Sequence, residues 1–326
     1  MGRTSICGHR AKEIFPKGRN TAMQTSVSFP SNGLRLAGIL FTPDDSAGER
    51  LPAVVVSHPG GGVKEQTASV YAKRLADKGF AALVFDAAYQ GESEGEPRFL
   101  EDPFQRSEDV KSAVTYLTTR DDIDSGRIGA LGICASGGYV PFAAQTDHRI
   151  KAVATVSGLD IGDYLSNGLG RTQDPAVLNE MLDAAGALRT AEALGAEPNY
   201  QIWAPPTAEG LEDAPELFRE AHDYYRTPRA QHPRSENKWP LQSIDRIAQF
   251  DAYAKIAMIS PRPLLMIAGS KADTKYFSDE AVAKAAEPKE LFVIDGASHI
   301  DLYDLDEYVT PAVAKLEEFF GKNLAG

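Results

Sequence analysis

The sequence is poor in positive charge, in cysteine and in long apolar stretches. It has 34 Lys and Arg residues against 46 Asp and Glu residues, so its net charge is −12. This balance excludes the basic surface that binds nucleic acid or anionic lipid. No apolar run is as long as a membrane span. We therefore expect a small-molecule substrate, no nucleic-acid partner and no membrane segment, and the sequence leaves a homodimer open.

The scarcity of cysteine excludes a disulfide framework. Only Cys7 and Cys134 are present, and a reducing cytoplasm suits a free, reactive thiol at Cys134. Six scattered histidines show no zinc-ligand spacing, and no GxGxxG motif follows the first buried strand, so we expect neither a metal nor an organic cofactor. Residues 1–23 lack the continuous apolar segment of a signal peptide, and we predict that they form a disordered extension.

Apolar runs alternate with helical periodicity over much of the 326-residue chain. Buried strands are expected at residues 52–57, 80–85, 127–131, 150–157, 263–268 and 289–294, and helices at 63–78, 104–119 and 307–323. An Asn32-Gly33 turn predicts an antiparallel hairpin over residues 25–29 and 34–41. This alternation predicts an α/β fold with a mostly parallel, doubly wound sheet, in which ligands bind beyond the carboxyl ends of the strands.

Residues 160–259 interrupt the alternation. They are rich in Ala, Glu, Pro and aromatic residues, show helical stretches near 175–194, 214–225 and 244–256, and contain no run typical of a sheet strand. We predict a helical cap there, inserted into a core of residues 24–159 and 260–326. Four side chains of the cap are candidates for binding substrate, although packing within the cap explains them equally well: His222, Tyr224, Tyr225 and Trp239.

Residues 127–139, RIGALGICASGGY, have the pattern of a strand, a sharp turn and the start of a helix. The nucleophile elbow of hydrolases follows the rule small-x-nucleophile-x-small, and two registers fit. We favour Cys134 as nucleophile, because Gly132 then stands where the turn needs the smallest side chain; Ser136 is the alternative. A helix N-terminus favours negative charge, so a lowered thiol pKa is expected for Cys134. A buried structural cysteine is the plain alternative.

Loops after other predicted strands supply the remaining candidates. Gly60 lies in a glycine-rich loop whose backbone can approach a ligand, and its N–H and that of Ala135 are the expected oxyanion hole. His299 follows the last predicted strand, and Asp273 and Asp160 follow two other strands, so these three side chains are expected at the same edge of the sheet.

With nucleophile, acid and histidine in this order, the sequence resembles an α/β-hydrolase of the dienelactone-hydrolase-related group. The resemblance covers the chain after Met23 and depends on RIGALGICASGGY, SHPGGGVKEQT, FDAAYQGESEGEPR and GASHIDLYD. It implies a cysteine nucleophile, since dienelactone hydrolases use one at the elbow. It also implies that His299 is the general base and that Asp273 orients it, with Asp160 as the alternative acid. Asp273 lies one residue farther along its loop than is usual in such hydrolases, so that loop must bulge. The chain departs from the group by Ser136, where glycine is usual, and by its cap, so the resemblance does not identify the substrate.

These residues predict hydrolysis of an ester, lactone or thioester of a small organic molecule through an acyl-enzyme on Cys134. Acyl transfer to an acceptor other than water is an alternative on the same fold. A different class is a non-catalytic protein that binds a small ligand or senses redox state through Cys134.

Overall fold

The computed structural model describes residues 22–44, 48 and 50–325. Cys7 and nearly all of the predicted N-terminal extension lie outside these residues. Within them, no helix combines the length and the apolar composition that crossing a bilayer requires.

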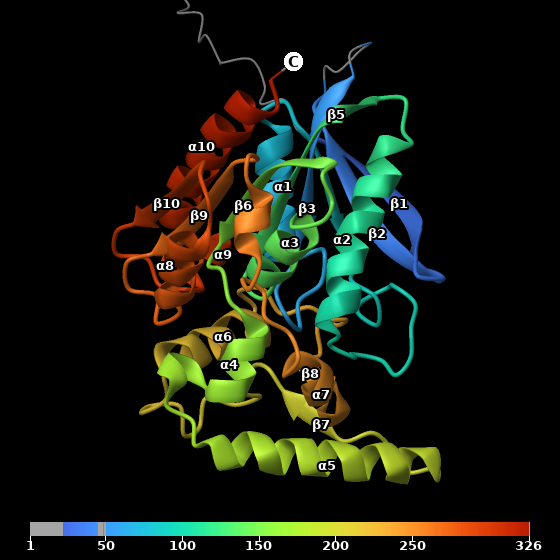
Figure 1. The fold of residues 1–326 in the computed structure, drawn as a ribbon, viewed down its shortest axis with the longest axis vertical. Coiled ribbons are helices and arrows are strands. Elements are labelled where there is room, and N and C mark those ends of the chain that lie inside the picture. The colour runs from blue at the N-terminus through green and yellow to red at the C-terminus, as the bar shows by residue number, and fades with distance from the viewer. Residues whose placement is uncertain (1–21, 45–47, 49, 326) are drawn as a thin grey trace, which may run out of the picture.

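An eight-stranded sheet forms the centre of the molecule, in the order β1-β2-β4-β3-β5-β6-β9-β10 (Figure 1). The first two strands form the predicted hairpin, β2 joins β4 antiparallel, and the other pairs are parallel. The predicted α/β fold with a mostly parallel sheet is confirmed. The strands are β1 (Met23–Ser31), β2 (Leu34–Thr42), β3 (Leu51–Ser57), β4 (Ala81–Phe85), β5 (Ile123–Ile133), β6 (Ile150–Val156), β9 (Leu264–Gly269) and β10 (Lys289–Ile294).

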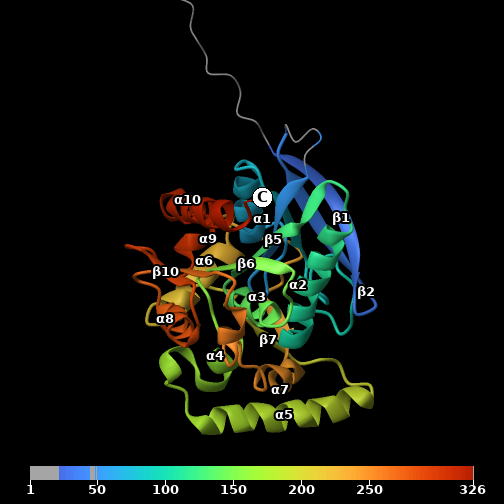
Figure 2. The same cartoon turned by 45° about the horizontal axis from the view of Figure 1, so that its top comes forward.

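Helices cover both faces of the sheet, as can be followed in Figures 1 and 2. The apolar run of β3 shows why: Val54 and Val56 pack into one core with α1 and α10, and Val55 packs into the other with α2, α3 and α8. A strand buried on both faces needs a continuous apolar run of this kind. The helices are α1 (Thr67–Ala76), α2 (Pro103–Thr118), α3 (Ser136–Ala144), α8 (Lys275–Lys284), α9 (Asp301–Asp304) and α10 (Asp306–Asn323).

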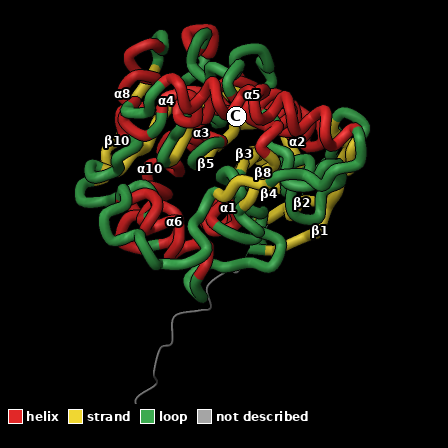
Figure 3. The backbone as a smooth tube through the Cα atoms, turned by 90° about the horizontal axis from the view of Figure 1, so that it is seen from below, coloured by secondary structure: helices red, strands yellow, loops and turns green. Residues whose placement is uncertain are grey.

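The segment between β6 and β9 lies beyond the carboxyl ends of the parallel strands (Figure 1). It contains α4 (Ile161–Asn167), α5 (Pro175–Ala193), α6 (Glu216–Arg226) and α7 (Ile244–Ile247), together with a short antiparallel ribbon of β7 (Tyr200–Ile202) and β8 (Lys238–Pro240). Seen from below in Figure 3, α5 crosses this end of the molecule. The segment therefore covers the edge where the candidate loops meet.

Two details of this segment differ from the prediction. The helix expected at residues 244–256 ends at Ile247 as α7, because the chain then turns to pack Phe250 against the rings of Tyr139 and Phe142. The β7–β8 ribbon was not predicted, since its two strands are short and lie far apart in the sequence. Both differences arise from contacts between distant residues, which local periodicity does not contain.

Candidate active site

Cys134 lies at the turn between a strand and a helix. β5 ends at Ile133 and α3 begins at Ser136, and between them Cys134 has φ = +56°, a left-handed conformation that few residues other than glycine adopt. The Cys134 N–H donates to the carbonyl oxygen of Val156 at 3.0 Å, which fixes the turn to the neighbouring strand. A Cβ at Gly132 would lie 2.0 Å from the Ser136 carbonyl oxygen. The turn thus has the geometry of a nucleophile elbow with Cys134 at its centre.

Ser136, the alternative nucleophile, points beneath this turn. Its side chain is fully buried, and its hydroxyl donates to the carbonyl oxygen of His58 at 2.6 Å. The Ser57 hydroxyl lies 2.9 Å from it, and an Arg106 N–H donates to it at 3.3 Å. The Cys134 side chain, in contrast, is partly exposed and lines a cavity. The geometry favours the Cys134 register.

The N–H groups of Gly60 and Ala135 lie within hydrogen-bonding reach of the Cys134 sulfur. The loop that bears Gly60 follows β3 and is supported by His58. The ring Nε2 of His58 accepts from the Ala87 N–H at 3.1 Å, so its Nδ1 donates to the carbonyl oxygen of the next residue at 2.7 Å. Burial lowers the pKa of His58 well below its ordinary value. This histidine is therefore neutral and holds the loop in place.

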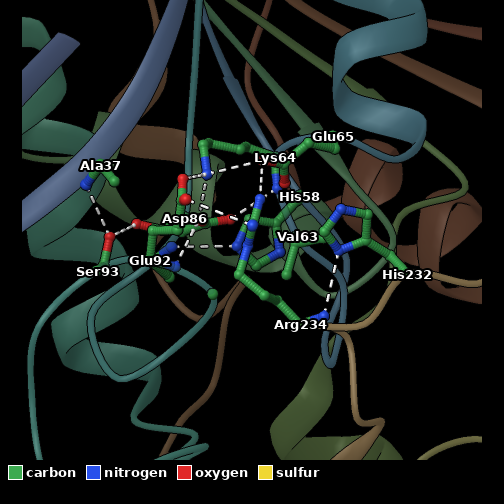
Figure 4. Close-up of polar contacts among 12 residues, drawn as sticks. Ala37, His58, Val63, Lys64, Glu65, Asp86, Glu92, Ser93, His232 and Arg234 are labelled. Atoms are coloured by element: carbon green, nitrogen blue, oxygen red, sulfur yellow. Dashed lines mark hydrogen bonds and ion pairs between the residues drawn. The ribbon is translucent and has the colours of Figure 1, made fainter. Parts of the chain in front are cut away.

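A partly buried cluster of ion pairs joins the inserted segment to the core beside this loop (Figure 4). Lys64 Nζ lies 2.7 Å from both Asp86 and Glu92 and 2.9 Å from Glu65. Arg234, which precedes β8, pairs with Glu65 and, at 3.3 Å, with Glu92. The cluster therefore fixes the inserted segment over the glycine-rich loop.

His299 reaches the site from the loop after β10. Its buried ring has Nδ1 2.5 Å from the Thr274 hydroxyl and Nε2 3.2 Å from the Tyr303 hydroxyl. Burial lowers the pKa of His299 to about 3, so the ring is neutral at pH 7. The Tyr303 hydroxyl is also within hydrogen-bonding reach of the Cys134 sulfur, so it contacts both the thiol and the imidazole.

Neither predicted acid is the hydrogen-bond partner of His299 Nδ1 in this structure, and this corrects the expected triad. The Asp273 carboxylate accepts from the Leu217 N–H at 3.2 Å, and Asp160 caps α4, where burial raises its pKa to about 6. The loop after β9 does not bulge enough to bring Asp273 to the ring, and the next residue, Thr274, takes the position instead. A hydroxyl orients the ring, and among the described residues no carboxylate is hydrogen-bonded to it to support an imidazolium.

The expectation of a lowered thiol pKa is also wrong. Burial raises the pKa of Cys134 and outweighs the Tyr303 hydroxyl and the two backbone amides, which act in the opposite direction. The helix N-terminus therefore does not by itself create a thiolate here, and at neutral pH the protonated thiol dominates.

Alkylation of Cys134 by iodoacetamide should therefore depend steeply on pH. Only the thiolate reacts, so we expect the rate to rise about tenfold for each unit between about pH 6 and pH 8. Mass spectrometry of the tryptic peptide 128–149, which contains Cys134 and not Cys7, measures the reaction, and the same peptide of Cys134→Ala gives the background. A rate that does not change over this range would show a preformed thiolate and contradict the raised pKa.

Two spaces share part of their lining, and one of them lies against the elbow. An inner cavity of about 60 Å³ is lined by Cys134 and by mostly apolar side chains, and a groove of about 550 Å³ lies on the other side of a shared wall. That wall consists of Tyr164, Trp203 and Phe218, which line both spaces. At about 60 Å³ the inner cavity has room for only a small group of atoms, so a larger molecule in it would have to extend past this wall.

Two of the four predicted substrate residues line these spaces, and two do not. Tyr225 lines the inner cavity and Trp239 lines the groove. Tyr224 packs edge-on against Tyr303, with ring centroids 5.1 Å apart, and His222 Nδ1 lies 2.9 Å from a backbone carbonyl oxygen. The structure thus brings two of the four to the candidate site.

Sequence reasoning missed Thr274 and Tyr303. The signal for Tyr303 was available, because it follows His299 by four residues, which is one helical turn. Thr274 has no comparable signal, since only the path of its loop decides that it and not its neighbour meets the ring. The described residues contain no group of three His, Cys, Asp or Glu side chains that could hold a metal ion.

The sheet order and the elbow define an α/β hydrolase. The chain belongs to the X-Pro dipeptidyl-peptidase (S15) family, whose family model matches residues 32–283. It is 41% identical over 308 residues to the uncharacterized protein YcjY of Escherichia coli, which covers 93% of this chain and 100% of that protein. The crystal structure of the hypothetical protein PA2218 of Pseudomonas aeruginosa matches with a TM-score of 0.87 at 35% identity, over 99% of this chain and 100% of that one.

A more distant relative has a named activity. The polyketide transferase grgF of a Penicillium species is 26% identical over 289 residues, covering 86% of this chain and 91% of that protein. Its crystal structure, described as an alpha/beta hydrolase, has a TM-score of 0.79 at 23% identity, over 93% of this chain and 100% of that one. Dienelactone hydrolase from Anabaena variabilis matches with a TM-score of 0.55 at 15% identity, over 93% of this chain and 99% of that one. The predicted resemblance is confirmed at the level of the α/β-hydrolase fold.

Proposed function

We propose that the protein cleaves an ester, lactone or thioester of a small organic molecule through a covalent acyl-enzyme on Cys134. The observation that supports this most is the position of the sulfur, at a strained elbow that faces a cavity, with the amides of Gly60 and Ala135 beside it. When the sulfur attacks a carbonyl carbon, the developing oxyanion lies next to these two donors.

In this proposal, His299 is the residue that performs the acid–base chemistry. As the S–C bond forms, its neutral ring accepts the thiol proton, and the ring later returns that proton to the leaving group. Thr274 holds the ring by its other nitrogen. Because no carboxylate in the described part of the chain pairs with the ring, a long-lived thiolate–imidazolium pair is disfavoured, and the proton moves as the sulfur attacks.

The apolar lining narrows the substrate class. None of the described residues that line the inner cavity carries a carboxylate, so the positively charged N-terminus of an X-Pro peptide would have no ionic partner there, and burying a bare charge is costly. A neutral acyl group meets no such penalty. The chemistry of the cavity therefore favours a neutral ester, lactone or thioester over the peptide substrate that the family description names.

Acyl transfer is the second candidate. The relative grgF is named a polyketide transferase, and a small, mostly apolar cavity around the acyl-enzyme limits the access of water. The same acyl-cysteine then serves both reactions, and the acceptor that enters the cavity decides between them.

A substrate panel tests the proposal. We expect turnover of p-nitrophenyl acetate and butyrate, of a simple lactone or of an acyl thioester, and no cleavage of a Gly-Pro p-nitroanilide. Adding an alcohol acceptor and analysing the products separates hydrolysis from transfer, because transfer yields a new ester. Cleavage of the Gly-Pro anilide alone would contradict the proposed substrate class, and an inert wild type across the panel would favour a non-catalytic binding protein.

A further inference from the structure

Tyr303 touches both reacting groups of the candidate site. Its hydroxyl lies 3.2 Å from His299 Nε2 and within hydrogen-bonding reach of the Cys134 sulfur. The side chain is almost wholly buried and, with Cys134, lines the inner cavity. A hydroxyl can accept one proton while it donates another, so this position suits a relay.

We propose that Tyr303 is a catalytic residue that passes the Cys134 proton to His299. This inference rests on the proposed function of the same site. In the step, the S–H proton of Cys134 moves to the Tyr303 oxygen while the Tyr303 O–H proton moves to His299 Nε2. The electron pair left on sulfur forms the bond to the carbonyl carbon, and the carbonyl π pair moves to oxygen. The tyrosine is neutral before and after, and no further reactant is needed.

The hydrogen bonds of the His299 ring are consistent with proton transfer from Tyr303 to His299. When Nδ1 of His299 donates to the Thr274 hydroxyl, Nε2 is left as the acceptor that faces Tyr303. Burial keeps the histidine neutral, with a pKa of about 3, and raises the pKa of Tyr303 well above its ordinary value. The Tyr303 hydroxyl therefore stays protonated, and it can accept the thiol proton only while it gives its own proton to His299.

The short helix α9 holds the relay in place through its backbone. The carbonyl oxygen of Tyr303 accepts from the Thr67 hydroxyl at 3.0 Å, and that of Leu302 accepts from the Tyr71 hydroxyl at 2.6 Å. Both donors lie on α1, so that helix fixes the backbone of α9, which carries the phenol. The same path serves the return of the proton to the leaving group when the tetrahedral intermediate collapses.

The test compares acylation rates in single-turnover measurements with p-nitrophenyl acetate. Tyr303→Phe keeps the ring and removes the hydroxyl, and we expect acylation to slow by about 10²-fold or more. Tyr253→Phe is the matched control, because it also removes a buried tyrosine hydroxyl, which donates to the Gly137 carbonyl oxygen at 3.0 Å, and Tyr253 is not among the residues that line the inner cavity; we expect its acylation to stay within about threefold of wild type. Tyr303→Phe acylating at the control rate would overturn the relay.

A double variant separates a relay from a structural role. If Tyr303 acts only by reaching His299, then Tyr303→Phe combined with His299→Gln should be no slower than His299→Gln alone. Independent, multiplying effects would contradict the inference. A wild type that shows no release of p-nitrophenol would instead refute the proposed function itself, so the two failures are distinguishable.

A measurement on the wild type does not depend on the folding of any variant. Because two protons move in the proposed step, acylation should be slower in heavy water than in light water. Equal rates in the two solvents would overturn the relay, and thermal unfolding of each variant establishes that the rates belong to folded protein.

Discussion

Cys134→Ala is expected to lower kcat/KM for the best ester of the panel by about 10⁴-fold or more, because removing the nucleophile leaves only the oxyanion donors and binding. Steady-state assays of p-nitrophenol release measure the loss. Ser136→Ala is the matched control, since it removes a hydroxyl two residues away that is buried beneath the turn.

The two variants should behave in opposite ways. We expect Ser136→Ala to keep activity within about tenfold of wild type and to lose about 1 kcal/mol of stability, through the hydrogen bond to His58 O. The opposite pattern, with activity lost in Ser136→Ala and kept in Cys134→Ala, would overturn the assignment of the elbow register.

Arg106→Met is expected to have the largest effect on stability. Arg106 and Glu101 are both almost fully buried, with Nε and Oε1 3.3 Å apart. The Arg106 guanidinium also donates to His58 O at 2.7 Å and lies over the Tyr139 ring, 5.0 Å from its centroid. Methionine would fill much of the space but leave the Glu101 carboxylate unpaired. Breaking a buried pair from one side costs about 3–5 kcal/mol, and denaturant unfolding measures the change.

A second variant tests the cause of this loss. If an unpaired carboxylate is responsible, then Arg106→Met with Glu101→Leu should be more stable than Arg106→Met alone. A decrease of less than about 1 kcal/mol in the free energy of unfolding of the single variant would show that the Arg106–Glu101 pair contributes little to stability. The Arg106 guanidinium also donates to the carbonyl oxygen of His58. We therefore expect the single variant to make the loop that bears Gly60 less well ordered.

Local sequence patterns predicted the strands of the sheet and the turn at Cys134 well, because each pattern depends on residues that are neighbours in the sequence. The sequence RIGALGICASGGY marks the strand, turn and helix around Cys134, since the turn tolerates only small side chains on either side. The last strand was predicted at residues 289–294, and β10 has these bounds. Continuous apolar runs such as that of β3 similarly reveal burial on both faces.

The predictions that differ from the structure concern properties set by contacts between segments that are far apart in the sequence. Whether Asp273 or Thr274 reaches His299 is decided by the path of one loop, which the spacing of residues leaves undetermined. The direction of the Cys134 pKa shift was missed because a helix N-terminus is visible in the sequence, whereas burial of the thiol is a property of the folded chain. Tyr303 joins the site because α9 begins two residues after His299 and brings the Tyr303 hydroxyl to His299 Nε2.

The central claim, an acyl group carried by the sulfur at the elbow, can be tested by direct detection. The protein is mixed briefly with p-nitrophenyl acetate, quenched in acid and digested with trypsin, which releases residues 128–149 as one peptide. We expect a mass increase of one acetyl group on this peptide, with fragment ions that place it on Cys134 and no increase in Cys134→Ala. Acetyl on Ser136, or a wild type that turns over substrate with this peptide unmodified at every time point, would contradict the account.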